Sequence, residues 1–228
     1  MSLILNIDTS GKTAAVSMAE NGIAIHTIIN ADQKDHAGFL HNAIHELVQK
    51  TSVRLSSLDA IAVVSGPGSY TGLRVGMAGA KGLCYALGKP FITIDSLRIM
   101  SDSVIGSTKK AYSLYCPLID ARRMEVFTAL FDNELNVLSN PGALILTESS
   151  FTEILETSQT CFFGSGAEKF EAISKHKNAV FLPVTDFTTS MCKLSFELFS
   201  TKKFTHLVDS EPLYIKEFYS PPDLGNKK

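Results

Sequence analysis

Two segments of the sequence share one pattern, and this repeat constrains the fold more than any other feature. The first half opens with the apolar run LILNID, which ends at Asp8, and two strand-like runs follow with a turn that begins at residues 20–21. The second half has the run LYCPLID, which ends at Asp120, then the strand-like run MEVFTALF and a turn at residues 132–133. The aspartate and the turn have the same spacing in both halves. The repeat therefore predicts two similar lobes, each beginning with a meander of three strands.

Helices and a glycine loop continue the pattern. Residues 36–50 carry apolar side chains at helical spacing, and Asp35 is positioned to cap this helix. A buried strand, AIAVVS, then runs into the glycine loop SGPGSYTGLRVG, and a second helix is expected over residues 73–87, ending at Gly88. In the second half a strand, the glycines of residues 164–166 and a short helix repeat this order. The arrangement predicts a duplicated α/β fold with a cleft between its lobes.

The actin, Hsp70 and sugar-kinase (ASKHA) architecture has this plan. It places the aspartates that end the first strand of each lobe, Asp8 and Asp120, opposite each other across the cleft. We expect residues 1–102 to form the first lobe, with the glycine loop and both long helices. We expect residues 103–228 to form a smaller, truncated second lobe, which includes a final helix near residues 187–201 and an extended tail.

The composition is that of an ordinary globular chain, and its charge excludes one class of function. The chain has 228 residues, of which 45% are hydrophobic, and a formal net charge of −2. No long basic run is present. The chain alone is therefore not expected to hold a nucleic acid by its phosphates, and if it acts on RNA, a partner is expected to bind the RNA.

Other features favour a soluble protein of the cytoplasm. The first residues meet Asn6 and Asp8 too early for a signal peptide, and no apolar run approaches the roughly 20 residues of a membrane span. No CxxC pair indicates a zinc knuckle or a disulfide framework. We expect reduced thiols at the four cysteines, Cys84, Cys116, Cys161 and Cys192.

The glycine loop lacks residues that the common phosphate loops carry. Leu73 and Arg74 follow Gly72 where a Walker A loop has lysine and then serine or threonine, and Thr71 replaces the third glycine of a dinucleotide loop. The loop can hold an anion on the amides at the helix start, or it can serve only to bring strand and helix together, and the second role is favoured. The candidate anion site comprises Gly66, Gly68, Ser69 and Thr71 of the loop, with Asp8 and Asp120 of the cleft.

Three glycines, Gly76, Gly79 and Gly82, lie inside the second helix, and each costs about 1 kcal/mol relative to alanine. A closely packed neighbour is the expected compensation, since these glycines leave helix faces without bulk. The neighbour is either the helix of residues 36–50 in the same chain or another subunit docked on both helices. The sequence leaves both alternatives open.

A pair of histidines on the first helix invites a metal assignment. His41 and His45 have the spacing of a zinc-binding pair, in the motif HNAIH. Asn42 stands where HExxH has its general-base glutamate, however, and no third ligand is evident. A packing or interface role is therefore favoured, and no metal ligand is assigned.

Four motifs together resemble the TsaB family, also called YeaZ: LNIDTS, SGPGSYTGLRVG, IDARRMEVFTALF and the tail segment EPLYIKEF. The resemblance runs over essentially the whole chain, with Tyr70 where the family commonly has Phe and Lys216 where the tail usually has Arg. It implies a partner subunit, without a complete active site or cofactor of its own, required for N6-threonylcarbamoyladenosine at position 37 of tRNAs that decode ANN codons. The implied partners are the catalytic paralogue TsaD and the ATPase TsaE, with tRNA bound only through the complex and no role for a membrane.

The resemblance also implies a contact surface made by the first two helices, and a homodimer when the protein is alone. The residues expected there are His36, Phe39, Leu40, Ile44, Leu47, Gly72, Val75, Gly76, Gly79 and Leu83. Two rival functions are a small phosphotransferase of the same fold and a zinc peptidase of the M22 type. The missing loop lysine and the short second lobe weigh against the phosphotransferase, and the missing glutamate and third ligand weigh against the peptidase.

Overall fold

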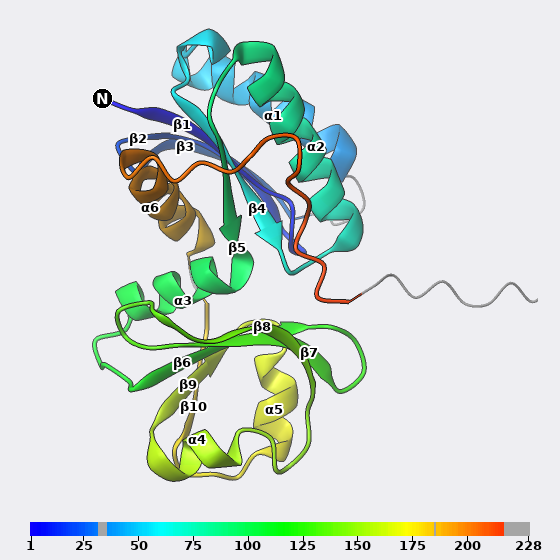
Figure 1. Cartoon of the computed structure of the whole chain (residues 1–228), viewed down its shortest axis with the longest axis vertical. Coiled ribbons are helices and arrows are strands. Elements are labelled where there is room, and N and C mark those ends of the chain that lie inside the picture. Colours follow the sequence, from blue (N-terminus) through cyan, green and yellow to red (C-terminus); the bar gives the residue numbers. More distant parts are fainter. Residues whose placement is uncertain (32–35, 185, 217–228) are drawn as a thin grey trace, which may run out of the picture.

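The structure, a computed structural model, describes residues 1–31, 36–184 and 186–216, without the side chains of residues 36 and 37. Asp35, the expected helix cap, lies outside the described residues. Within this part of the chain the strands form two five-stranded sheets, one in each lobe (Figure 1). The first sheet contains β1 (Leu3–Asp8), β2 (Ala14–Glu20), β3 (Ile23–Asn30), β4 (Ala60–Gly66) and β5 (Phe91–Asp95). The second contains β6 (Leu114–Asp120), β7 (Glu125–Phe131), β8 (Val137–Ile145), β9 (Thr160–Phe163) and β10 (Ala179–Leu182).

The two sheets have the same strand order, which confirms the predicted duplication. The first runs β3-β2-β1-β4-β5 and the second β8-β7-β6-β9-β10. In each sheet the first strand of the lobe is central, and it pairs antiparallel with the next strand and parallel with the strand beyond the meander. Asp8 and Asp120 both end these central strands.

The helices are α1 (His36–Thr51), α2 (Tyr70–Leu87), α3 (Ser96–Ser107), α4 (Thr152–Thr157), α5 (Ala167–Ile173) and α6 (Phe187–Ser200), with a short 3₁₀ turn at Leu55–Ser57. The second lobe is reduced in its helices, since α4 and α5 are much shorter than α1 and α2, although its sheet is complete. None of the helices in the described residues is long and apolar enough to span a membrane.

The central strand β1 is apolar because helices cover both faces of the first sheet. Leu5 and Ile7 lie in a core cluster with residues of α1 and α2, while Ile4 lies in a second cluster with residues of α3 and α6. Strands buried on both faces have no reason to alternate apolar with polar residues. The run LILNID thus reads as nearly continuous apolar sequence.

Helix α2 has the end signals that the sequence predicts. Ser69 is the N-cap, and its hydroxyl accepts a hydrogen bond from the amide of Gly72 at 3.3 Å. Gly88 takes the left-handed conformation at the other end, with φ of 62°. The predicted C-terminus of the helix is therefore confirmed, whereas the helix begins at Tyr70, earlier than expected.

The prediction missed α3, which crosses the expected boundary between residues 102 and 103. Asp95 caps this helix, and its Oδ1 accepts hydrogen bonds from the amides of Leu97 at 2.6 Å and Arg98 at 3.3 Å. The segment reads as a polar loop because it contains Ser101 and Asp102, yet both are buried. The Ser101 hydroxyl donates to the Leu97 carbonyl, and Asp102 pairs with a lysine of α6, so these polar groups are satisfied inside the protein.

The final helix and the tail pack on the first lobe, whereas we predicted them to belong to the second. Met191 and Leu194 of α6 lie in one core cluster with Ile4 and Ile92 of the first sheet. After α6 the tail runs along the edge of β5, where the Thr205 amide donates to the Phe91 carbonyl at 2.8 Å. The apolar face of α6 explains this position, since the first sheet needs a cover on the face opposite α1 and α2 (Figure 1).

One core cluster joins the two lobes. It includes Ile4 and Ile92 of the first sheet, Tyr115 and Phe163 of the second sheet, and residues of α3 and α6 between them. The lobes are therefore packed against each other through shared apolar side chains rather than connected only by linkers.

All four cysteines are buried and unpaired. Burial raises the pKa of Cys84, Cys116 and Cys161 to about 12. Because the thiolate is the reactive form, we expect a disulfide reagent such as DTNB to react with the native protein at least about 100-fold more slowly than with the urea-unfolded protein. Absorbance at matched pH measures both rates, and a fast native reaction of one thiol would show that its pocket opens to solvent.

Candidate functional site

The glycine loop is shaped by the turn that follows β1. The amide of Ser69 donates to the Ser10 carbonyl at 2.7 Å, so the loop and this turn are in backbone contact. A Cβ added at Gly68 or Gly72 would overlap the carbonyl oxygen of Ser10 or Thr9. At these two positions glycine is required because only a residue without a side chain lets the two backbones meet.

The tail crosses the other side of the loop. The amide of Leu213 donates to the Ser65 carbonyl at 2.7 Å, and the Leu213 carbonyl oxygen lies 3.0 Å from the place where a Cβ of Gly66 would be. Gly66 has φ of 116°, which a residue with a side chain rarely adopts. Gly66, Gly68 and Ser69 are thus all engaged within the chain, which supports the packing role for the loop. Thr71, the fourth residue of the candidate anion loop, is exposed.

Aromatic and basic side chains fix the tail to the start of α2. The Arg74 Nε donates to the Tyr214 hydroxyl at 3.0 Å, and its guanidinium lies 4.2 Å from the centre of the Tyr70 ring. The rings of Tyr70 and Tyr214 are 5.2 Å apart. Lys81, two turns along the helix, donates to the carbonyls of Val208 and Ser210. These contacts hold the tail along one side of α2.

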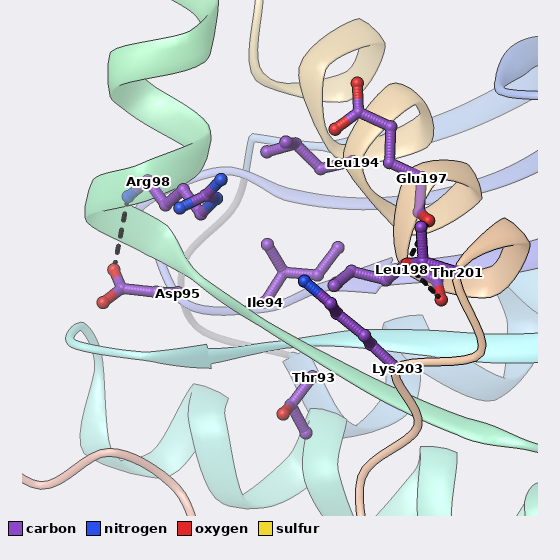
Figure 2. A pocket seen from close by; sticks show the side chains of 9 residues that line it. All are labelled: Thr93, Ile94, Asp95, Arg98, Leu194, Glu197, Leu198, Thr201 and Lys203. Atoms are coloured by element: carbon purple, nitrogen blue, oxygen red, sulfur yellow. Dashed lines mark hydrogen bonds between the residues drawn. The ribbon is translucent and has the colours of Figure 1, made fainter. Parts of the chain in front are cut away.

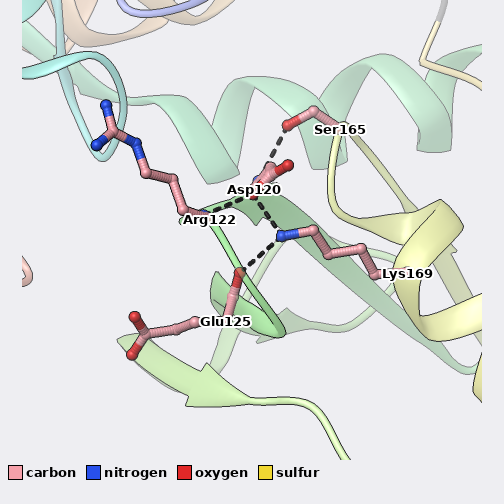
Figure 3. Close-up of polar contacts among 5 residues, drawn as sticks. All are labelled: Asp120, Arg122, Glu125, Ser165 and Lys169. Carbon is pink, nitrogen blue, oxygen red and sulfur yellow. Dashed lines mark hydrogen bonds and ion pairs between the residues drawn. The ribbon is translucent and has the colours of Figure 1, made fainter.

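Asp120 is the centre of a polar cluster at the start of the second lobe (Figure 3). Its Oδ1 accepts from the Lys169 ammonium at 2.5 Å and from the amide of Arg122 at 2.6 Å, while its own amide donates to the Ser165 hydroxyl at 3.0 Å. Lys169 also donates to the Glu125 carbonyl at 3.4 Å. The carboxylate predicted to face the cleft is therefore already paired with a cation of α5.

The charge state of Asp120 reflects this pairing. Desolvation raises the pKa of Asp120, but the hydrogen bonds from Lys169 and Arg122 and the charges of Lys169 and Lys12 outweigh it, so that the pKa lies below its ordinary value. Lys12 belongs to the turn after β1, so the first lobe does reach toward Asp120. Asp8, the matching residue, accepts from the Ser10 amide at 2.8 Å and the Ser10 hydroxyl at 2.6 Å.

A second ion pair links the tail to the second lobe. Lys216 lies 2.5 Å from a carboxylate oxygen of Glu125, which is mostly buried, at the start of β7. The same nitrogen also donates to the other oxygen of this carboxylate, at 2.6 Å, so the compact charge of lysine suffices for the contact.

The predicted interface residues divide into an inner and an outer set. The structure buries half of them inside the first lobe: Leu40, Ile44, Leu47, Gly72 and Gly76. A Cβ on Gly79 would lie 2.6 Å from Cδ2 of Leu40, so the close neighbour of Gly79 is α1 of the same chain. Phe39, Val75, Gly79 and Leu83 are half-buried, and the side chain of His36 lies outside the described residues.

The outer face of α2 carries a different set of small residues. Ala78, Gly82 and Ala86 follow one another at intervals of four and are all exposed, and a Cβ added at Gly82 would meet nothing within 4 Å. Tyr85 stands beside them with 85% of its surface exposed. We call these four residues the outer face of α2. None of the four is among the predicted interface residues, because periodicity identifies the apolar stripe but not which small residues remain uncovered.

His41 and His45 are both exposed on α1, and His45 Nε2 lies 2.9 Å from Gln49 Nε2. Among the described residues no group of three or more His, Cys, Asp or Glu is arranged to hold a metal ion.

The sequence predicts Asp120 as a candidate residue but not the lysine that pairs with it. Lys169 is 49 residues away in sequence, and no local pattern connects the two.

Comparisons with known proteins identify the family. A family model described as "TsaD: tRNA N6-adenosine threonylcarbamoyltransferase" matches residues 25–196, well over half of the chain. The TsaB protein of Bacillus subtilis is 32% identical over 135 residues, which cover 59% of this chain and 57% of that protein. A tRNA N6-adenosine threonylcarbamoyltransferase of Borrelia garinii is 28% identical over 193 residues, covering 78% of this chain and 51% of that protein.

The chain thus spans between about half and three fifths of the length of these curated relatives. The structure of YeaZ from Pseudomonas aeruginosa matches with a TM-score of 0.76 at 22% identity, covering 94% of this chain and all of that one, which supports the predicted fold class. Because the family model covers most of the chain, and the chain is similar in sequence to a TsaB protein, the chain belongs to the TsaB/YeaZ family.

Proposed function

We propose that this protein is a non-catalytic partner subunit in the synthesis of N6-threonylcarbamoyladenosine on tRNAs that decode ANN codons. It acts in the cytoplasm with a TsaD-like catalytic paralogue and a TsaE-like ATPase. The match to the TsaD family model and the similarity to a TsaB protein support the pathway. The net charge of −2 supports binding of tRNA through the complex rather than by this chain alone.

The outer face of α2 is the observation that carries the partner role. Ala78, Gly82 and Ala86 present a flat strip on which another helix can pack at short distance. Tyr85, almost fully exposed beside the strip, is of the residue type that dominates binding energy at interfaces. A strip of this kind also suits a second copy of the chain, so we infer that the free protein dimerises and exchanges this contact for the paralogue.

The residues predicted to line a cleft between the lobes support a role without catalysis. Asp120 is neutralised by Lys169, and the glycine loop is packed between the turn after β1 and the tail. A phosphotransferase needs groups free to contact the transferring phosphate. In this chain Asp120 and the glycine loop are instead engaged by other residues of the same chain.

Replacing Gly82 by leucine is expected to weaken binding to the TsaD-like paralogue by at least about tenfold, because the new side chain prevents close approach of a helix. Gly106 on α3 is the matched control, since it is also an exposed helical glycine with nothing within 4 Å of an added Cβ. Gly106→Leu should bind as the native chain does. Co-purification of tagged chain and paralogue, followed by light scattering, measures the effect.

Two different results would show that the proposed contact surface is wrong or that the proposed function is wrong. If Gly82→Leu assembles normally while the native pair co-purifies, the partner binds elsewhere on this chain. If the native chain does not co-purify with the paralogue, and cells that lack it keep normal N6-threonylcarbamoyladenosine in their tRNA by nucleoside mass spectrometry, the proposed function is wrong.

A further inference from the structure

A cleft lies on the side of the first sheet opposite α1 and α2. It has a volume of about 400 Å³ and is bounded by the end of β5, the start of α3 and the last two turns of α6 with the segment that follows (Figure 2). Its apolar lining comes from Ile94, Leu194 and Leu198. Small-molecule sites commonly occupy about 300 to 1,000 Å³ and combine an apolar wall with a few polar groups.

Two cationic side chains line this cleft. Arg98 reaches in from α3 and Lys203 from the segment after α6, and Figure 2 shows both charged groups directed into the same opening. Among the described residues neither forms an ion pair, in contrast to Lys169, Lys193 and Lys216, which each pair with a carboxylate. The Arg98 guanidinium donates a hydrogen bond to the carbonyl of Leu135, at 3.4 Å.

Two acidic residues, Asp95 and Glu197, also line the cleft. Asp95 uses its carboxylate to cap α3, accepting from the amides of Leu97 and Arg98. Burial raises the pKa of Asp95, while these hydrogen bonds and the nearby charge of Arg98 lower it in part. Glu197 is exposed on α6 and pairs with no cation of the described chain. Like charges that share a hollow with apolar walls repel each other more than they would in water, and an anion between them removes that repulsion.

The backbone that carries the two cations is held in place. The Lys203 amide donates to the Leu198 carbonyl at 2.9 Å, and two residues later the tail is bonded to β5 through Thr205. The capping contacts of Asp95 fix the first turn of α3. The cleft walls thus do not depend on a ligand for their position, which lowers the entropic cost of binding one.

We propose that this cleft binds a small organic anion, a carboxylate or a phosphate monoester carried on an apolar body. The anionic group lies between Arg98 and Lys203, and the apolar body lies against Ile94, Leu194 and Leu198. The site is separate from the outer face of α2, across the sheet from it, and does not depend on the proposed function.

Benzoate and phenyl phosphate are suitable probes, with benzyl alcohol as the uncharged analogue, all at constant ionic strength. Amide shifts of the ¹⁵N-labelled full chain report both the affinity and the location. Either anion is expected to shift the amides of Ile94, Arg98 and Lys203, and benzyl alcohol should bind at least about tenfold more weakly. Comparing the two anions distinguishes a site for carboxylates from one for phosphates.

The variants are expected to change the affinity for the anion in opposite directions. Arg98→Gln and Lys203→Gln should each weaken anion binding by about tenfold, and Glu197→Gln should tighten it about twofold because it removes a repelling charge. Lys177→Gln, an exposed lysine of the second lobe, should leave affinity unchanged. Lys203 makes no polar side-chain contact in the described chain, so Lys203→Gln tests the site even if Arg98→Gln folds poorly. Equal affinity in the native chain and Lys203→Gln, equal binding of benzyl alcohol, or no binding of either anion would overturn the proposal.

Discussion

Replacing Gly72 by alanine is expected to lower the free energy of unfolding by about 3 kcal/mol, because the added methyl group would overlap the Thr9 carbonyl oxygen. The same replacement at Gly82 is expected to raise it by up to about 1 kcal/mol, since alanine is the better helix former and nothing lies within 4 Å. Both positions are in α2, Gly72 in its first turn and Gly82 in its interior. Urea denaturation followed by circular dichroism measures both values.

The contrast between the two variants tests the packing role of the glycine loop. If Gly72→Ala is as stable as Gly82→Ala, the turn after β1 does not approach α2 as closely as described. The packing explanation of the loop would then fail, and its glycines would need a functional reason such as binding an anion.

Replacing Phe170 by alanine should lower the free energy of unfolding by about 4 kcal/mol. Its ring is fully buried in the second lobe and lies 4.8 Å from that of Phe162 and 5.1 Å from that of Phe151, measured between ring centres. Because one core cluster includes residues of both sheets, we expect the whole chain to unfold in a single transition.

Leu47→Ala is the matched variant in the first lobe, where Leu47 is fully buried. It should destabilise the same transition by about 3 kcal/mol. Circular dichroism and tyrosine fluorescence are expected to give one midpoint for each variant. Two separate midpoints in Phe170→Ala would mean that the lobes unfold independently and that the shared cluster does not couple them.

The sequence predicts the repeated architecture because the signals for it are local. The strand ending at Asp8 recurs in the strand ending at Asp120, and residues near each helix end, such as Ser69 and Gly88, act within a few positions. Helix α3 escapes prediction because its Ser101 and Asp102 find partners that only the folded chain supplies. The position of α6 was not predicted either, because the apolar stripe of a helix does not indicate which sheet the helix covers.

The candidate site is less predictable for the same reason. Which glycines of α2 are covered by the chain itself depends on how α1 crosses it, and the structure assigns Gly79 to Leu40 while leaving Gly82 exposed. The partners of Asp120 and Glu125 come from distant parts of the chain, namely Lys169 and Lys216. The spacing of the repeat identifies Asp120 but not Lys169, the cation that neutralises it.

The packing of α3 against α6 has a consequence for how such a chain can change in evolution. The chain leaves the first lobe at the end of α3 and returns at the start of α6, where the Asp186 amide donates to the Ser103 hydroxyl at 3.3 Å. In sequence, the second sheet with α4 and α5 therefore lies between two segments that pack together in the first lobe, and the chain enters and leaves it at neighbouring points (Figure 1). Deletions and additions can change the size of the second lobe while the first lobe keeps its structure, as long as they spare the core cluster that the two lobes share.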